Sequence, residues 1–298
     1  MRTSKLIGLI LVVVVVISLA AVWFFPSIQD FMAGNTMWNG VNDFMTAFNA
    51  KNIDSFSGLP QSPANNVLVS IPYIDYTIAD MASMKNFVEN GGTLVMMDDF
   101  SYGNSFLEYT GSNIRFDNTL LLDPLFNFKN EYLPRITDFS PAIQAAGIKV
   151  IGFNHATILT GATASQTVAW SSNMSYTDTN QNGAQDSGEA QGPFTVAAEY
   201  AYGKGTIELI SDPSLIINTM VGQNDNNAFV RYMVNINGVP KNVLFDRSHL
   251  TKSPLDTSKI DMQAVLTFIS NPYVLSGVIA GVFAIIIGYV YKRGLIIG

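Results

Sequence analysis

The sequence predicts an α/β domain with a parallel central sheet and an antiparallel β addition, flanked by two transmembrane helices. Three observations support this class. A strand, a helix and a second strand follow one another early in the chain, strand-like runs separated by Gly and Asn turns begin at residue 148, and two uncharged apolar segments bracket the rest. Continuous apolar strands joined by a helix are typical of a right-handed parallel crossover covered by helices.

The strand–helix–strand unit starts at Val67–Pro72, a short apolar run that we interpret as a buried strand. Thr77 is placed to cap a helix over Ile78–Glu89, which ends at Gly91 where the chain needs a left-handed residue. Thr93–Met97 is the next strand. This unit predicts the core of the parallel sheet.

Other elements follow from apolar periodicity and turn residues. Helices are expected at Val41–Ala50 with Asn39 as its cap, Asn104–Tyr109, Asn226–Asn237 and Ser258–Ile269, and strands at Lys149–Asn154, Thr167–Ser171, Thr195–Tyr200, Thr206–Ile210 and Asn242–Phe245. We interpret the four strands from 149 to 210 as an antiparallel patch, with a hairpin turn at Ala201–Gly205. Residues 113–140 show no clear pattern.

Two apolar segments, Leu6–Phe25 and Tyr273–Tyr291, carry no charge. Each is long enough to cross the roughly 30 Å hydrocarbon core as a helix. The first segment is also consistent with a cleaved signal peptide, but its apolar run is long and Trp23–Pro26 is a poor cleavage site. We expect an uncleaved anchor. Gly277 and Gly281 in the second segment have the GxxxG spacing of packed membrane helices, so self-association or other membrane proteins are the expected partners.

The flanking charges predict the orientation. Arg2 and Lys5 precede the first segment, and Lys292 and Arg293 follow the second, with no acidic residue at either end. Lys and Arg are retained on the cytoplasmic side, so both termini should be cytoplasmic in a two-pass cell-membrane protein. The expected boundaries are a tail at 1–5, a transmembrane helix at 6–25, an extracytoplasmic domain at 26–257 with its β-rich part at 148–210, a juxtamembrane helix at 258–272, a second transmembrane helix at 273–291 and a tail at 292–298.

Composition narrows the function classes. The two ends hold four of the 16 basic residues and none of the 23 acidic ones, so the middle segment has a formal charge of −11. Nucleic-acid binding needs a basic surface and is disfavoured, whereas cations or basic partner surfaces suit this charge. The chain has no cysteine, which excludes disulfides, cysteine nucleophiles and cysteine metal sites.

The segment from Asp178 to Glu189 matches a twelve-residue calcium loop. Its ligand positions are Asp178, Asn180, Asn182, Ala184 through its carbonyl, Asp186 and Glu189, with Gly183 at the sharp turn. Its flanks are strand-like, so the alternative is an acidic surface hairpin. A lone extracellular Ca²⁺ site would bind weakly and stabilise the turn.

Polar residues follow several predicted strands. Asp98 and Asp99, with Asn104 beyond them, come after one strand, and Asp212 follows another. Ligands of open parallel sheets bind at this edge, so these residues and His249 are candidate ligand-binding residues. Helix capping and turn formation are the alternative roles. No G-x-S-x-G nucleophile motif accompanies the two histidines, His155 and His249, which we expect to be structural.

The loop triplet Asn173-Met174-Ser175 has the pattern of a glycosylation acceptor at Asn173. This triplet occurs often by chance, so occupancy is an open alternative at this point.

Several of these motifs together resemble a known family. Gly91-Gly92-Thr93-Leu94 leading into Asp98-Asp99-Phe100, Ser211-Asp212-Pro213-Ser214 with Asp225-Asn226-Asn227 after it, and Leu244-Phe245-Asp246 with Ser248-His249 are similar to the archaeal and bacterial membrane-protein family named domain of unknown function four-three-five-zero. The resemblance covers roughly Gly40–His249. It implies a flavodoxin-like or class-I glutamine-amidotransferase-like fold that lacks the cysteine nucleophile. Arg247 stands where the family often has an acidic residue.

We expect a non-catalytic, membrane-anchored ectodomain that acts as a binding or scaffold subunit of a cell-surface or membrane complex. One alternative is a hydrolase that uses Asp98, Asp99 and His249 at the sheet edge. The other, implied by the resemblance, is an accessory subunit of an ABC-type transport system.

Overall fold

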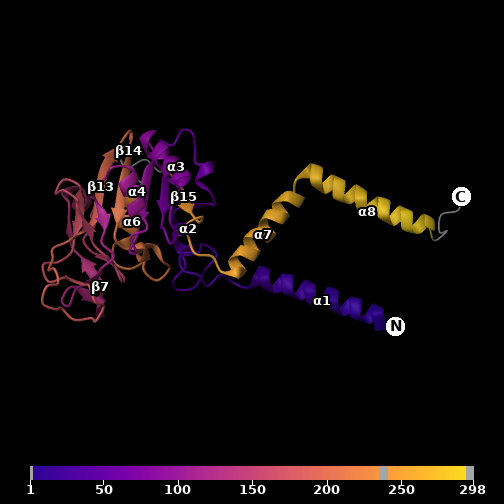
Figure 1. Ribbon diagram of the computed structural model, residues 1–298, viewed down its shortest axis with the longest axis horizontal. Coiled ribbons are helices and arrows are strands. Elements are labelled where there is room, and N and C mark those ends of the chain that lie inside the picture. The colour runs from indigo at the N-terminus through magenta and orange to yellow at the C-terminus, as the bar shows by residue number, and fades with distance from the viewer. Residues whose placement is uncertain (1–2, 235–240, 293–298) are drawn as a thin grey trace. The chain divides into compact units, whose positions relative to one another are not determined.

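The computed structural model describes residues 3–234 and 241–292. The chain divides into two compact units, Pro26–Thr251 and a second unit that joins Met1–Phe25 to Lys252–Gly298. Figure 1 shows their elements in chain order. The predicted terminal tails at 1–2 and 293–298, and the end of the predicted helix beyond Val234, lie outside the described residues.

The larger unit is built on one mixed sheet whose centre is parallel. Its strands follow the order β1 (Lys51–Ile53), β15 (Asn242–Asp246), β2 (Asn66–Ser70), β3 (Thr93–Met97), β14 (Gly205–Ile210), β13 (Thr195–Tyr202), β10 (Leu159–Thr160) and β4 (Arg115–Phe116), with β11 (Thr167–Trp170) and β8 (Asp138–Phe139) joined to β13. From β1 to β14 all pairings are parallel, and from β14 onward they are antiparallel. The predicted mixed α/β class with a parallel central sheet is confirmed.

One strand differs from its predicted place. We assigned Thr206–Ile210 to the antiparallel patch, but β14 pairs parallel with β3 from Thr206↔Thr93 to Ile210↔Met97. The tight turn at Gly203, where φ is +61°, connects β13 to β14, and β13 pairs antiparallel with the edge of β14 that faces away from β3. β14 therefore joins the parallel centre to the antiparallel addition.

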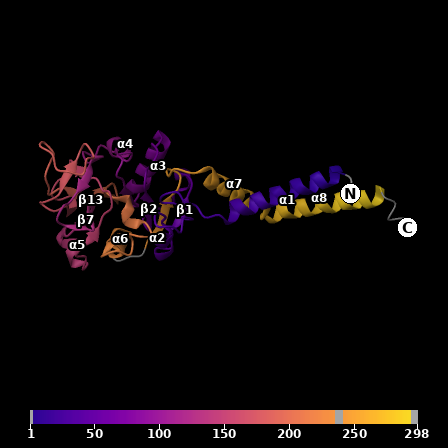
Figure 2. The same ribbon diagram turned by 90° about the horizontal axis from the view of Figure 1, so that it is seen from below.

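Helices cover both faces of the sheet because side chains of a strand point alternately to either side. Val67 and Val69 of β2 belong to one core, and Leu68 between them belongs to the other. Figure 2 shows α3 (Ile78–Glu89) and α4 (Asn104–Tyr109) on one side, and α2 (Asn42–Ala47), α5 (Pro141–Ala145) and α6 (Asn226–Val234) on the opposite side.

The predicted cap is present at the start of α3 but absent at the start of α2. Thr77 accepts a hydrogen bond from the Asp80 backbone, and the Asp80 carboxylate accepts one in return, which forms a capping box on α3. Asn39 does not cap α2, because that helix starts from Val41 without a side-chain cap. The Asn39 amide oxygen instead accepts a hydrogen bond from Asn35.

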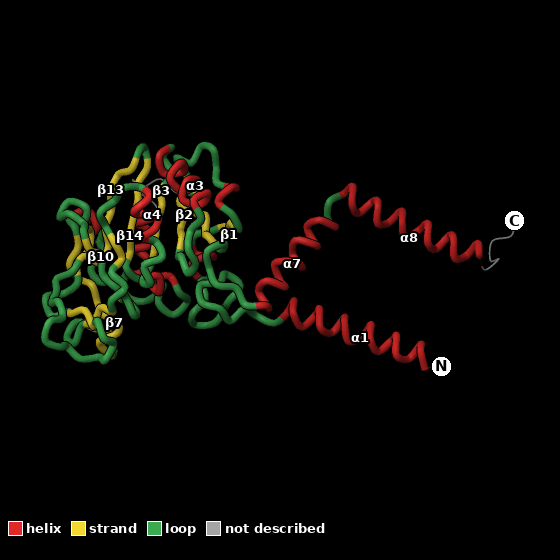
Figure 3. The backbone as a smooth tube through the Cα atoms, in the orientation of Figure 1, coloured by secondary structure: helices red, strands yellow, loops and turns green. Residues whose placement is uncertain are grey.

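Short strands fill the region whose sequence shows no clear pattern. β5 (Leu120–Leu122) pairs with β12 (Tyr176–Asp178), and β7 (Asn130–Ile136) lies between β6 (Asn127–Phe128) and β9 (Ile151–Gly152). Figure 3 shows how much loop separates them. Two single-turn 3₁₀ helices, η1 (Phe56–Gly58) and η2 (Pro213–Ile216), follow β1 and β14. Strands of two or three residues carry too little periodicity to be predicted.

The smaller unit contains α1 (Thr3–Phe24), α7 (Pro254–Ile269) and α8 (Pro272–Lys292). Two spans, Leu6–Phe24 and Pro272–Lys292, are long and apolar enough to cross a membrane, with mean hydropathies of 3.1 and 2.2. α7 starts four residues before the predicted Ser258, because Ser253 and Asp256 form a capping box ahead of it. Gly277 and Gly281 have open space around them within the unit.

Candidate functional site at the edge of the sheet

The connections that follow two adjacent parallel strands, β3 and β14, lie on opposite faces of the sheet. β3 is followed by α4 on one face, and β14 is followed by η2 and then α6 on the other. Their last residues, Met97 and Ile210, are register partners. Where connections diverge in this way a crevice opens at the carboxyl ends of the strands, and ligands of open α/β sheets bind there.

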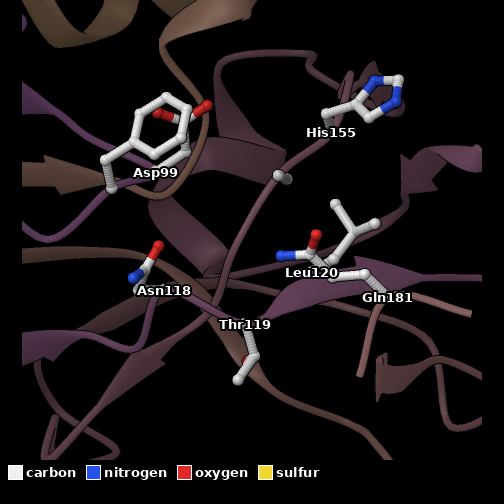
Figure 4. A pocket seen from close by; sticks show the side chains of 8 residues that line it. Asp99, Asn118, Thr119, Leu120, His155 and Gln181 are labelled. Carbon is white, nitrogen blue, oxygen red and sulfur yellow. The ribbon is translucent and has the colours of Figure 1, made fainter. Parts of the chain in front are cut away.

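A cavity of about 210 Å³ lies at this edge. Its lining residues come from the ends of β3 and β9, the turn before β5 and the loop after β12: Asp99, Phe100, Asn118, Thr119, Leu120, His155, Ala156 and Gln181. Figure 4 shows Asp99 and His155 on different walls, with Asn118, Thr119 and Gln181 below both in this view. Of the predicted ligand-binding residues, Asp99 alone is in this lining.

The carboxyl groups of Asp98 and Asp212 accept backbone hydrogen bonds from the loops at this edge of the sheet. Asp98 accepts hydrogen bonds from the Phe100 and Gly103 backbones at 2.8 and 2.6 Å, and Asp212 accepts them from Ser214 and Asn154 at 2.7 and 2.6 Å. Burial raises the pKa of Asp98 to about 6 and that of Asp212 to about 7, although these hydrogen bonds act in the opposite direction. The hydrogen bond from the Asn154 backbone to Asp212 also connects the loop after β9 to the end of β14.

Asp99 differs from its two neighbours because it does not organise a turn. Its Oδ1 atom is buried and has no hydrogen-bond partner among the described residues. Burial, followed by the nearby charges of Asp212 and Asp98, raises the pKa of Asp99 to about 8. The carboxyl group is therefore mainly protonated at neutral pH, so this lining residue carries both a donor and an acceptor.

His155 lines the cavity, although the sequence predicted only a structural role for it. Its backbone adopts a φ of +56°, and its ring stacks on Tyr132 with a centroid separation of 5.2 Å. Nδ1 lies 2.8 Å from the Asn154 side-chain oxygen, and burial lowers the pKa of the ring. We expected a structural histidine, and the fold brings it to the Asp99 cavity. Its position directly after a strand that reaches the same edge was the available signal.

Asn104 links two elements and lies outside the cavity lining. Its side-chain nitrogen donates to the Phe116 carbonyl, and its side-chain oxygen accepts from the Phe116 backbone, both at 2.9 Å. This pair of bonds joins α4 to β4.

His249 belongs to a second polar cluster, at the end of β15. Nδ1 donates to Asp246 at 2.8 Å, and Nε2 lies 3.5 Å from Asp80 at the start of α3. Burial lowers the pKa of His249, but the hydrogen bond and charge of Asp246 and the charge of Asp80 outweigh it, so the pKa is raised. Ser248 donates to Asp246 at 2.5 Å, and its hydroxyl oxygen also lies 3.0 Å from Nδ1 of His249. Because Nδ1 carries the proton that it donates to Asp246, it is not a base for this serine, and Nε2 faces Asp80.

A family model for a domain of unknown function, DUF4350, matches residues 35–234, which confirms the resemblance. The chain belongs to the DUF4350 family. No curated protein matches it.

Solved structures show two kinds of distant similarity. The mmIFT52 N-terminal domain is 13% identical over 58% of this DUF4350 chain and 78% of its own, with a TM-score of 0.44. A β-galactosidase from Bacillus circulans sp. alkalophilus is 10% identical over 59% of this chain and 23% of its own, with a TM-score of 0.37. The chain therefore spans less than a quarter of that enzyme. At these TM-scores neither similarity assigns a function.

The predicted calcium loop of this DUF4350 chain is folded around its own backbone. Asp178 accepts hydrogen bonds from Asn182 and Gly183 at 3.2 and 2.8 Å, and Glu189 accepts one from Thr179 at 2.8 Å. Asp186 accepts from the amide of Asn182 at 2.8 Å. Within residues 3–234 and 241–292, no group of three or more His, Cys, Asp or Glu side chains is arranged to hold a metal ion.

Asn173 is exposed in the loop between β11 and β12. Ser175, the third residue of the predicted glycosylation triplet, is buried, and its hydroxyl oxygen lies 2.7 Å from both the Ser171 hydroxyl and the Ser172 carbonyl.

Proposed function

We propose that the chain is a membrane-anchored ectodomain with a flavodoxin-like core that binds a ligand or partner at the Asp99 edge without transforming it. It would act as a binding or scaffold subunit of a cell-surface membrane complex. The observation that carries the proposal is the unpartnered, buried Oδ1 of Asp99 beside a cavity. A buried polar atom without a partner is costly, so a site that retains one is suited to receiving a hydrogen bond from outside.

The placement of His249 supports a binding role over the predicted hydrolase. A hydrolase using Asp98, Asp99 and His249 needs the histidine within reach of the substrate and of a nucleophile. Both nitrogens of His249 face Asp246 and Asp80, and the residue does not line the Asp99 cavity.

Membrane anchoring rests on the two apolar helices and on the flanking charges. The spans Leu6–Phe24 and Pro272–Lys292 suit a two-pass arrangement, and Arg2, Lys5 and Lys292 favour cytoplasmic ends. The domain between them would then face outward and be tethered to the bilayer at both ends. Such a scaffold would, for example, be an accessory subunit of an ABC-type transport system.

The test compares proteins that purify with the full-length chain from its native membrane after chemical crosslinking. We use the wild type, Asp99→Ala, which removes both the donor and the acceptor, and a control, Asp43→Ala, which replaces an exposed aspartate on α2. A specific partner is expected with the wild type and the control and should be lost with Asp99→Ala. An identical partner set for all three variants would overturn binding at this edge.

A second candidate function follows from the shared cavity of Asp99 and His155. A protonated carboxyl group and a neutral imidazole on different walls are a general acid and a general base in suitable protonation states. Turnover of amide, ester or glycoside substrates that disappears in both Asp99→Asn and His155→Gln would replace the non-catalytic proposal with this hydrolase.

We also propose that the Asp178–Glu189 loop binds Ca²⁺. Its carboxylate, amide and carbonyl oxygens are the ligand types that Ca²⁺ prefers, and its turn at Gly183 has a φ of +74°. Calorimetric titration of the full chain with CaCl₂ should release or absorb heat and raise the melting temperature. Glu189→Gln, which removes the expected bidentate carboxylate, should weaken binding at least tenfold. Absence of both effects in the wild type would contradict the site.

A further inference from the structure

The Asp99 cavity is continued by a second cavity of about 140 Å³. His155 lines both, so the two cavities are adjacent. The second is formed mainly by the loop after residue 26 and by Tyr73, which follows β2. We call the pair of cavities the edge cleft.

Each cavity of the edge cleft is lined by an exposed aromatic ring. Phe100 lines the first cavity and is 50% exposed, and Trp38 lines the second and is 61% exposed. Between them the Tyr73 ring meets Phe100 edge-on, with a centroid separation of 5.4 Å. Large exposed aromatic side chains beside cavities offer flat apolar surfaces on which a ligand can stack.

The loop that carries Trp38 is held by hydrogen bonds and therefore presents this ring in a defined place. Asn218 donates to the Met37 carbonyl at 2.6 Å, and Thr219 donates to the Trp38 carbonyl through its hydroxyl at 3.1 Å. A preorganised surface loses less entropy when a ligand binds.

The polar groups of the edge cleft are amides, hydroxyls and carboxyl groups. Asn118 and Gln181 supply amides, and Asp99 supplies a carboxyl group. Neither lining contains a Lys or Arg. Phosphate, sulfate and carboxylate ligands are therefore disfavoured, also because Asp212 and Asp30 lie nearby.

We infer that the edge cleft binds a neutral saccharide that spans both cavities. Sugar hydroxyls both donate and accept, which matches amides and a protonated carboxyl group, and the C–H faces of sugar rings stack on aromatic side chains. The inference rests on the proposed function, since it names the class of ligand at the same site.

A cationic amine is the competing ligand, because aspartates and aromatic rings also attract cations. Asp30 in the second lining suits a cation, but the side-chain amides of Asn118 and Gln181 in the first favour the neutral ligand, because they match hydroxyl groups and offer no charge to an ammonium group. The test therefore includes both classes.

The experiment measures binding to the full-length chain in detergent micelles by calorimetry. The probes are neutral disaccharides of hexoses and of N-acetylhexosamines, with spermidine for the cationic class and a hexose phosphate for the anionic class. The variants are Trp38→Ala, Phe100→Ala and the matched control Phe126→Ala, which removes a ring that is 49% exposed but lines neither cavity. Thermal melts check that each variant is folded.

We expect a neutral disaccharide to bind, with affinity about tenfold weaker in Trp38→Ala and in Phe100→Ala and unchanged in Phe126→Ala. Binding of spermidine alone, binding that all three variants retain equally, or no saccharide binding up to millimolar concentration would overturn the inference. Retention of the Asp99-dependent membrane partner in that last case would leave the proposed function intact, so the two failures are distinguishable.

Discussion

At the scale of single residues, three aspartates at one sheet edge have different roles because of their hydrogen-bond partners. Asp98 and Asp212 each accept two backbone hydrogen bonds, whereas the Oδ1 of Asp99 accepts none from the residues that the structure describes. All three have raised pKa values because burial disfavours the ionised form. Only Asp99 combines this property with a free oxygen beside a cavity, which is why the site centres on it.

The raised pKa of Asp99 predicts how stability depends on pH. The folded carboxyl group retains its proton up to about pH 8, whereas the unfolded one releases it near 3.8, so the folded state binds more protons between these values. The free energy of unfolding should therefore fall as pH rises from 4 to 8. Asp99→Asn removes this contribution and should flatten the slope, measured by urea unfolding with tryptophan fluorescence.

The exposed Asp43→Asn variant is the control for this measurement and should keep the wild-type slope. A residual slope is expected in Asp99→Asn, because Asp98 and Asp212 also have raised pKa values. Equal slopes in the wild type and in Asp99→Asn would contradict the assignment of a retained proton to Asp99.

At the scale of elements, the connection between β14 and the rest of the sheet depends on close backbone packing. A Cβ atom on Gly205 would overlap the carbonyl oxygens of Val88 and Gly92 at the end of α3. Backbone atoms cannot move aside as a flexible side chain does, so glycine is required where β14 begins.

Gly205→Ala should therefore lower the free energy of unfolding by about 2 kcal/mol, in the range observed for overpacked sites. The matched control is Gly222→Ala, because the space around Gly222 is open and a Cβ meets nothing within 4 Å. Urea unfolding of both variants measures the difference. A Gly205→Ala protein as stable as the control would show that the end of α3 and β14 are less tightly packed than described.

Sequence patterns predicted the longer elements well and the short ones poorly. Ile78–Glu89 has the predicted helix bounds because a capping residue at one end and Gly91 after the other are both encoded locally. By contrast, β5 and β12 have three residues each and pair across more than fifty positions. These strands are stabilised by that pairing, and neither segment is long enough to show a periodic apolar pattern.

At the scale of the whole molecule, the proposed topology predicts which parts of the chain are accessible from outside the cell. Because the chain has no cysteine, single cysteines can be introduced without background. With a membrane-impermeant maleimide, Asn173→Cys should react on intact cells, and Ser4→Cys should react only after lysis. Asn173 suits this purpose because it is exposed.

Two outcomes of this labelling would contradict the two-pass topology. Reaction of Ser4→Cys on intact cells would reverse the orientation. Absence of the residue-4 cysteine from the mature chain would instead show that the first segment is a cleaved signal peptide.

The sequence by itself determined the parallel strand–helix–strand core and the two apolar helices, because apolar periodicity and capping residues are local, and its motifs carried the resemblance to the family. Only the tertiary structure decided that β14 pairs with both β3 and β13, and that Asp99 shares its cavity with His155 while His249 binds Asp246 and Asp80. Strand pairing and burial join residues that are far apart in the chain, so no local pattern encodes them. The free oxygen of Asp99 is likewise a property of its surroundings.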